Sequence, residues 1–529
     1  MKNPLSFKRV KSLAAVLAVV MASSLVASCL ANDDPDTTDP VTTAATTAPA
    51  ATDDETDEVT DPETEDTEAP DTTDEPTTDD VTDDPDGTET DEATEPGEDQ
   101  VNNGEPVEIT YINWNLGTEE ENNLERRMIA EYIERYPNVT ITLADYIDTA
   151  AYNESLTNAA AGGRLPDVFM LPTIPFALNG DWLLDISEYT TGDSEWDSIA
   201  APVLDAVTYG DAQYAIPAGQ FIAGMWVNPD VFAAANAPQP EFGYSLEELD
   251  DAIIAMADPA NQTLGIEFEV DLVNFYPHLL NNSLGWFTWD GEQYNLNSPE
   301  FIESVNKAKS FFENGSVFDA LSDDEKASYP GESSFDVWMS GNTAMKYDGS
   351  WLAGGISDMS FTPEFIGLPD GKVVIIGDYI GINKDAENAE AAYHFTRWMT
   401  YSTAGQLERI QIVEENEDLN WGSMPLTSDS EVLEAYFATN RVAGLEAGYE
   451  NIDDGVVETF KIIPGYAASR WEAQTGVSVG DNDNASIGDL IFDAIRGNTQ
   501  IEDYADQLND LANSEYQSAM DAIDADFGG

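Results

Sequence analysis

The distribution of apolar residues from residue 107 onward predicts alternating strands and helices. Apolar and polar residues alternate over 107–112, which is typical of a strand with one buried face, and this strand is expected to end near Trp114. Apolar residues then recur every third or fourth position over 124–136, as in an amphipathic helix. Pro137 is expected to end that helix, because proline cannot continue the hydrogen-bond ladder.

The same alternation of elements continues and predicts a parallel sheet. Residues 139–143 alternate again, a helix is expected around 152–161, and 166–171 is typical of a short, fully buried strand. Strand, helix, strand, helix, strand implies parallel pairing, so the sequence predicts an α/β fold. Further along, Ser298 and Pro299 are typical of a helix start.

The first 28 residues are predicted to be a signal peptide rather than part of the fold. Four basic residues precede the apolar stretch 13–26, which is too short for a membrane-spanning helix but suits a signal-peptide core. The small residues before Cys29 resemble the bacterial lipobox, although Val26 stands where leucine is commoner. The resemblance implies that Cys29 becomes the lipid-modified first residue of the mature chain, and the alternative is a plain secretory signal. Because Cys29 is the only cysteine, an internal disulfide and a cysteine-based zinc site are excluded.

Residues 29–106 are predicted to be a disordered linker. From residue 31 to 106 the chain holds 29 Asp and Glu and no Lys or Arg, interleaved with Thr, Pro and Ala. Such a segment cannot bury enough apolar surface to offset its chain entropy. We therefore expect a solvated spacer about 50 Å long or longer. The alternatives are a segment that binds calcium or a basic partner.

The remainder, 107–529, is large and strongly acidic. It retains 74 of the chain's 103 acidic residues against 16 Lys and Arg, which gives a net charge of −58 and makes nucleic acid an improbable partner. Its 423 residues exceed what one core supports, yet no second linker interrupts them, which favours two lobes that share chain crossings.

No catalytic or metal-binding arrangement stands out in the sequence. His278 and His394 are the only histidines, and no Ser-His-Asp triad, His-rich metal set or phosphate-binding glycine loop can be assembled. The run 481–484 with Gly488 and Asp489 faintly resembles a calcium loop, but its ligand spacing is broken, which favours a polar turn. We therefore expect no enzyme activity, no cofactor and no metal. A carboxylate-only glycosidase stays open, because sequence cannot choose two acids from 74.

Several motifs together resemble the family 1 extracellular solute-binding proteins of ABC importers, which include maltose-binding protein. The resemblance covers most of 107–406. After the strand that ends at Trp114, its pieces are, in chain order, Tyr136-Pro137-Asn138-Val139, Ala159 to Val168, Asp205 to Pro217, Trp226 to Phe232, Phe335 to Trp351 and Gly377 to Ile382.

The resemblance implies a two-lobed periplasmic-binding-protein type II fold with a hinge and a ligand cleft between the lobes. By analogy the chain crosses between lobes near residues 217, 373 and 416–421. Lobe 1 would comprise about 107–217 and 373–415, and lobe 2 about 218–372 and 416–529.

Ligands of doubly wound sheets bind beyond the carboxyl ends of the strands. The candidates for the ligand site are therefore tryptophans and polar residues in the loops that follow predicted strands. Tryptophan rings stack on the C–H faces of sugars, and carboxylates and amides bind the hydroxyls. The alternative for each tryptophan is core packing, which we expect for Trp196, Trp338 and Trp398. For Asp167 the alternative is fold support. The predicted ligand-binding residues are Trp114, Asp167, Trp226, Asn228, Trp286, Trp289, Asp348, Trp351, Asp378, Tyr379 and Trp421.

We hypothesise from these features a monomeric lipoprotein receptor that captures an oligosaccharide for the permease subunits of an ABC importer. It would be anchored through Cys29 at the outer face of the bacterial cytoplasmic membrane. A polyamine receptor is an alternative, because polyamines also stack on aromatic rings and pair with carboxylates. A peptide receptor, a surface adhesin or lectin, and a glycan-active enzyme are further alternatives.

Overall fold

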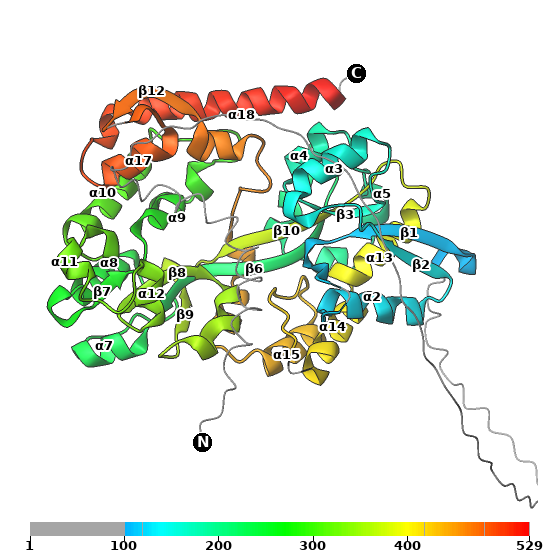
Figure 1. Ribbon diagram of the computed structural model, residues 1–529, viewed down its shortest axis with the longest axis horizontal. Coiled ribbons are helices and arrows are strands. Elements are labelled where there is room, and N and C mark those ends of the chain that lie inside the picture. Colours follow the sequence, from blue (N-terminus) through cyan, green and yellow to red (C-terminus); the bar gives the residue numbers. More distant parts are fainter. Residues whose placement is uncertain (1–100, 119, 417, 481, 528–529) are drawn as a thin grey trace, which may run out of the picture. The chain divides into compact units, whose positions relative to one another are not determined.

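The computed structural model describes residues 101–118, 120–416, 418–480 and 482–527, with side chains up to residue 523. The predicted strands of the first part of the chain join later strands in one mixed sheet (Figure 1), in the order β2-β1-β3-β10-β6-β8-β7, with β9 beside β6 and β11 beside β10. The members of this sheet are β1 (Val107–Ile112), β2 (Val139–Leu143), β3 (Val168–Leu171), β6 (Ile216–Val227), β7 (Leu264–Ile266), β8 (Thr343–Gly349), β9 (Glu364–Gly367), β10 (Val374–Ile382) and β11 (Val456–Val457).

Four shorter strands form two separate antiparallel pairs. They are β4 (Thr208–Tyr209) with β5 (Ala212–Gln213), and β12 (Gln474–Val479) with β13 (Asn482–Ser486).

The first half of the sheet has the parallel pairing that the sequence predicts. Strand β1 lies between β2 and β3 and is parallel to both. Helices cover both faces of this half of the sheet, with α3 and α4 on one side and α2, α13 and α14 on the other (Figure 1). The helices of this half are α2 (Leu124–Arg135), α3 (Tyr152–Ala161), α4 (Ile174–Asn179), α5 (Ser187–Thr190), α6 (Ala201–Ala206), α13 (Ala389–Thr400), α14 (Thr403–Glu415), α15 (Ser430–Thr439) and α16 (Leu445–Tyr449).

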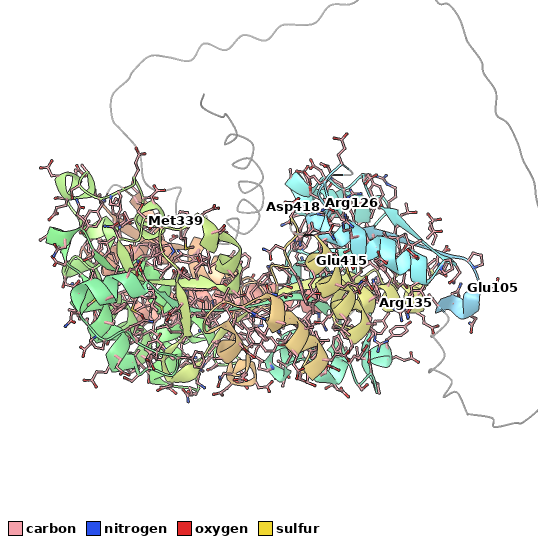
Figure 2. The ribbon with its side chains drawn as sticks, turned by 90° about the horizontal axis from the view of Figure 1, so that it is seen from below. Glu105, Arg126, Arg135, Met339, Glu415 and Asp418 are labelled. Carbon is pink, nitrogen blue, oxygen red and sulfur yellow. The ribbon has the colours of Figure 1, made fainter. Side chains whose placement is uncertain are left out.

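The second half is built around β7 and β8, which are parallel to each other. Helix α10 begins where the sequence predicts, since Pro299 is its first residue and the Ser298 side chain accepts a hydrogen bond from the backbone N–H of Phe301. The helices of this half are α7 (Pro229–Ala235), α8 (Leu246–Met256), α9 (Leu272–Leu280), α10 (Pro299–Glu313), α11 (Asp323–Lys326), α12 (Ser334–Met339), α17 (Ile487–Ile495) and α18 (Ala505–Phe527). Arg126 and Arg135 of α2 lie on the same half as Glu415, whereas Met339 lies on the other (Figure 2).

Two long antiparallel strands, β6 and β10, connect the halves. They pair from Val374 opposite Ala223 to Asp378 opposite Gly219, and we call this region the strand crossing. Strand β3 is antiparallel to β10, and β8 is antiparallel to β6. The carboxyl ends of the parallel strands in both halves therefore point toward the strand crossing, where a ligand of such sheets is expected.

Buried side chains form two main cores. One lies mainly in the first half and extends to Trp338 and Phe365 of the second half, and the other lies in the second half. Trp196, Trp338 and Trp398 are buried, which confirms the prediction that they are core residues. Buried residues from Trp421 to Ile452 belong to the core of the first half, and those from Ile463 to Ala512 belong to the core of the second. The lobe boundaries given above stay a prediction.

The packed part of the chain includes residues that the sequence assigned to the linker. Val101 is buried, and the Asn138 side chain donates hydrogen bonds to the carbonyl oxygens of Val101 and Glu105. Cys29, the signal peptide and the linker up to residue 100 lie outside the described residues. Within the described residues, no helix has the length and apolar character to cross a bilayer.

Asp167 joins strand β3 to strand β1 through side-chain hydrogen bonds. One of its carboxylate oxygens accepts hydrogen bonds from the backbone N–H (2.8 Å) and the hydroxyl (2.7 Å) of Thr110, and its own N–H donates to that hydroxyl oxygen (2.8 Å). Asp167 precedes β3, so these bonds tie the amino end of β3 to β1.

We predict that Asp167→Ala lowers the free energy of unfolding by about 2 kcal/mol, because it removes two hydrogen bonds to a charged group. Denaturant unfolding of the full chain measures this change, with Asp510→Ala, at an exposed position of α18, as the control. Equal stabilities of the two variants would contradict the assignment.

Candidate functional site

One face of the strand crossing is incompletely covered. Strand β6 is buried except at Ala218 and Phe221, and β10 is buried except at Ile376 and Asp378. Phe221 lies opposite Ile376, Gly219 opposite Asp378, and Met225 opposite Tyr347. Since directly opposed residues share a face and strand side chains alternate, Phe221, Tyr347, Ile376 and Asp378 lie on the same face. We call these four residues the crossing face.

Trp351 borders the crossing face. It follows β8 in the 3₁₀ segment η10 (Ser350–Asp358), is partly exposed, and its ring meets Phe221 edge to face at 5.4 Å. Gly349 permits this position, because a Cβ there would lie 2.3 Å from the tryptophan ring. The two rings give the site a flat apolar element.

Asp378 is held by a lysine from another part of the chain. Its carboxylate forms an ion pair with Lys461, and both side chains are partly exposed. The segment that carries Lys461 joins both halves, since its carbonyl oxygen accepts from Ile174 N–H at the start of α4, and Glu458 N–H donates to Ile375 on β10. The ion pair therefore sits where the two halves meet.

Tyr347 brings an unsatisfied hydroxyl to this face. Its ring stacks on Phe275 of α9 at 5.0 Å, and its buried hydroxyl has no hydrogen-bond partner among the described residues. Burial raises the pKa of this hydroxyl, and the nearby carboxylates Glu458 and Asp271 raise it further. The hydroxyl is thus neutral and available to a bound molecule.

Asp271, Glu458 and Asp348 all raise the pKa of Tyr347. Of these three acids, Asp271 and Glu458 make no side-chain hydrogen bond within the described part of the chain. Burial raises the pKa of Asp271 to about 7, with Glu267 adding to the rise and Lys346 opposing it. Burial likewise raises the pKa of Glu458 to about 7, with Lys461 opposing the rise. Both carboxyl groups would gain from hydrogen-bond donors supplied by a ligand.

A buried arginine completes this side of the site. Arg470, in the π-helical turn η13 (Ala468–Glu472), is fully buried, and its guanidinium donates to the Asn274 side chain and lies over the rings of Phe287 (4.0 Å) and Trp471 (3.3 Å). Burial lowers its pKa to about 10, while Tyr466 and Asp271 oppose the shift. Arg470 thus offsets part of the negative charge of Asp271.

The structure brings few of the predicted ligand-binding residues to the crossing face. Asp378 belongs to it and Trp351 borders it. Trp286 is connected to it indirectly, because its indole N–H donates to the Tyr466 hydroxyl (2.9 Å). Tyr466 in turn raises the pKa of Tyr347, and Glu458 raises the pKa of Tyr466.

Four predicted aromatic residues are buried within the protein, including Trp286, which is 4% exposed. Trp226 is fully buried against Phe365, and its indole N–H donates to the carbonyl oxygen of Asp348. Tyr379 is 2% exposed. Trp421 is buried against Tyr436 and donates to the Ser423 hydroxyl.

The predicted polar residues mostly hold the fold together. Asn228 caps α7 and donates to the carbonyl oxygen of Gly341, while Asp167 joins β1 to β3 as described above. Asp348 lies opposite Gly224, on the other face from Tyr347, in an ion pair with Lys346 (3.5 Å). Burial raises the pKa of Asp348, and Lys346 opposes this shift.

The remaining predicted tryptophans lie apart from the crossing face. Trp114 follows β1 and meets Tyr152 edge to face at 5.3 Å. Trp289 packs against Tyr294 and, at 4.7 Å, against Tyr516 of α18.

Sequence reasoning missed most of the side chains that form the site, namely Phe221, Tyr347, Ile376, Asp271, Glu458, Lys461 and Arg470. Phe221, Tyr347 and Ile376 lie inside strands, where apolar residues predict core. One signal was available for Lys461 and Arg470, because only 16 basic residues follow the linker and each is therefore conspicuous.

No group of His, Cys, Asp and Glu in the described ranges is arranged to hold a metal ion. Over its described residues, the calcium-like run 481–484 is the start of strand β13 and not the polar turn that the sequence predicts. Asp489 caps α17 by accepting from Ser486 N–H, and it also accepts from the Asn482 side chain.

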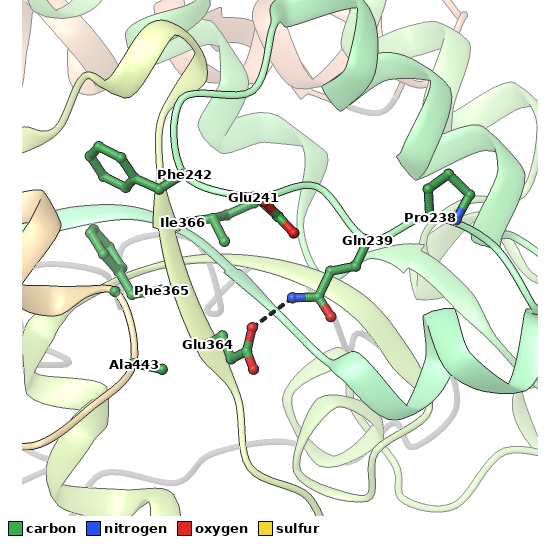
Figure 3. A pocket seen from close by; sticks show the side chains of 9 residues that line it. Pro238, Gln239, Glu241, Phe242, Glu364, Phe365, Ile366 and Ala443 are labelled. Carbon is green, nitrogen blue, oxygen red and sulfur yellow. Dashed lines mark hydrogen bonds between the residues drawn. The ribbon is translucent and has the colours of Figure 1, made fainter.

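Two pockets in the described part of the chain lie beside β9 and beside α18. The larger, of about 570 Å³, lies beside β9 and is lined by 238–242 and 443–444, with Gln239 donating to Glu364 at 2.7 Å (Figure 3). It includes no residue of the crossing face. The second, of about 420 Å³, lies between α4, the segment 460–468 and α18, and therefore adjoins Lys461.

Comparison with known proteins shows which fold and family these features represent. An ABC substrate-binding protein from Listeria monocytogenes in complex with cycloalternan is 21% identical, with 80% of this chain and 100% of that chain covered and a TM-score of 0.55. A cyclic alpha-maltosyl-1,6-maltose binding protein from Arthrobacter globiformis is 15% identical, with 78% and 100% covered and a TM-score of 0.55. A cyclo/maltodextrin-binding protein complexed with maltotetraose is 16% identical, with 78% and 98% covered and a TM-score of 0.58.

These likenesses confirm the predicted α/β, two-lobed periplasmic-binding-protein type II fold. No curated protein sequence matches the chain significantly. The sequence pattern of the bacterial extracellular solute-binding proteins matches residues 117–406, which is more than half of the chain. The chain therefore belongs to the bacterial extracellular solute-binding protein family.

Proposed function

We propose that this protein captures a carbohydrate, specifically an oligosaccharide, at the crossing face and delivers it to an ABC importer. The observation that carries the proposal is the Trp351–Phe221 ring pair beside an unpartnered tyrosine hydroxyl and two carboxyl groups without hydrogen-bond donors. Structurally similar proteins bound to cycloalternan and maltotetraose support the ligand class.

The chemistry of the site suits a neutral, hydroxyl-rich molecule. A sugar ring offers C–H groups to the tryptophan face, and its hydroxyls can donate to Asp271 and Glu458 and accept from Tyr347. Each hydrogen bond to a charged group contributes about 1.5–3 kcal/mol, and burial of a large aromatic surface adds to this. The groups that lack partners in the free protein would thereby gain them in the complex.

A cationic solute fits less well. Lys461 already neutralises Asp378, and Arg470 offsets part of the charge of Asp271. A polyamine would therefore meet two fixed positive charges beside the carboxylates, and like charges repel strongly in a buried site.

The protein would act as a membrane-anchored receptor and not as an enzyme. We infer that the protein binds without catalysis and that Cys29 carries a lipid that tethers it to the membrane. Its partners would be the permease subunits of the importer. Closure of the two halves about β6 and β10 would trap the solute and signal its presence, which requires that the solute favour the closed form by several kcal/mol.

A thermal-shift screen of the full chain tests the ligand class directly. We expect maltotetraose or a cyclic α-glucan to raise the melting temperature, because a ligand at 100 times its dissociation constant adds about 2.7 kcal/mol to stability. Spermidine and peptides should leave it unchanged. Stabilisation by spermidine alone, or accumulation of cleaved sugar products, would contradict the proposal.

We predict that Trp351→Ala weakens binding of the stabilising sugar by about tenfold or more, equivalent to about 1.4 kcal/mol, because it removes the flat apolar surface next to Phe221. Isothermal titration calorimetry measures the change. Tyr146→Ala, which removes a 46% exposed ring away from the crossing face, should bind normally. Unchanged affinity of the Trp351 variant would exclude this face as the sugar site.

We predict that sugar affinity rises about fivefold to tenfold between pH 5.5 and 8. Asp271 and Glu458 are largely protonated below a pKa of about 7, and sugar hydroxyls favour their ionised forms, so binding lowers both pKa values and releases protons. Calorimetry across this pH range measures the effect.

The matched control for the pH effect is Glu269→Gln. Burial also raises the pKa of Glu269 to about 7, but this residue lies outside the crossing face. Its charge raises the pKa of Asp271 less than burial and Glu267 do, so its removal leaves most of that shift in place. The double variant Asp271→Asn, Glu458→Gln should abolish the pH dependence while Glu269→Gln retains it. An unchanged pH profile in the double variant would show that these carboxyl groups do not bind the sugar.

A further inference from the structure

The C-terminal helix α18 reaches from one half of the molecule to the other. It has 23 residues, which gives a length of about 35 Å at 1.5 Å per residue. Leu508 and Ala512 are buried in the core of the second half, whereas Ile523 is buried in the core of the first. Figure 1 shows the helix running from beside α17 to a position above α4.

The middle of α18 is seated closely on the segment 458–468. Gly465 has a left-handed backbone (φ +68°), and a Cβ there would lie 2.9 Å from the Cβ of Ala519 and 3.1 Å from the carbonyl oxygen of Glu515. Both the backbone conformation and the close approach require glycine at this position. Tyr516, which directly follows Glu515 in this helix, packs on Trp289.

The far end of α18 forms a wall of the 420 Å³ pocket. Ala519, Ala522 and Ile523 contribute this wall, α4 contributes Pro175 and Phe176, and the segment 460–468 contributes the third side. Phe460 and Tyr466 meet edge to face at 5.6 Å in that third side. The pocket lies next to Lys461, because Phe460 and Ile463 line it. The Lys461 side chain pairs with Asp378 of the crossing face, and its carbonyl oxygen accepts a hydrogen bond from α4.

Helix α4 belongs to the first half, and most of α18 belongs to the second. Any movement of the halves about β6 and β10 must therefore change the contact between α18 and α4. We propose that α18 is a lid over the solute site: its last turns close the 420 Å³ pocket by resting on α4 in the closed form and leave α4 when the halves open. The lid rests on the proposed function, because it regulates the same site.

The test compares hydrogen exchange in the full chain without sugar. Ile523→Glu should unseat the end of α18, because a charge replaces an apolar side chain that is 8% exposed. We expect amide exchange at least about tenfold faster in 173–179 and 460–468, with β1 and β2 unchanged. Ser518→Glu adds the same charge at an exposed position of the same helix and should exchange like the unmodified protein.

A second measurement separates a moving lid from a static support. Maltotetraose should dissociate about tenfold faster from the Ile523 variant than from the Ser518 variant in stopped-flow experiments. Ile523→Ala provides a milder change if the glutamate variant does not fold, and it should show the same effects at smaller size.

The outcomes distinguish this inference from the proposed function. Equal exchange in 173–179 for the Ile523 and Ser518 variants would overturn the lid, whichever sugar binds. Faster exchange together with an unchanged sugar dissociation rate would also overturn it, because α18 would then support the fold without controlling the site. Failure of every sugar to bind would refute the proposed function and with it the lid over that site.

Discussion

The antiparallel pairing of β6 with β10 is the constraint on which the rest of the structure depends. These strands belong to both halves of the sheet, so the parallel strands on either side point their carboxyl ends toward the same place. The pairing also brings Phe221 onto one partly uncovered face with Ile376 and Asp378, which come much later in the sequence. The location of the site thus follows from the register of two strands.

The chemistry of that face follows from incomplete satisfaction of buried polar groups. Asp271 and Glu458 have raised pKa values because burial disfavours their charge and no donor compensates them, while the Tyr347 hydroxyl has no partner among the described residues. Buried polar groups in proteins are normally hydrogen-bonded. Buried side-chain atoms without a partner also occur elsewhere in the described residues. What favours a ligand-binding interpretation over a purely structural one is the combination of the Tyr347 hydroxyl and two carboxyl groups of raised pKa with the partly exposed Trp351–Phe221 ring pair.

The sequence predicted the α/β alternation, the start of α10 and the fold well, because these depend on local periodicity, capping and motif order. It predicted the site less well. The motif tryptophan Trp226 is buried against Phe365, which is distant in sequence, and Asp167 is engaged by Thr110, 57 positions away. Conversely, Tyr347 and Phe221 look like ordinary strand residues, and only the register across β6, β8 and β10 shows that they share an accessible face.

A hydrogen-exchange footprint of the full chain with and without a stabilising oligosaccharide tests the central claim most directly. The account predicts that the sugar slows exchange in 347–351, 376–378 and 458–461, which surround the crossing face, and leaves 238–242 and 364–366 unchanged. Protection confined to 238–242 and 364–366, which line the larger pocket beside β9, would contradict it, because the sugar would then bind away from the strand crossing.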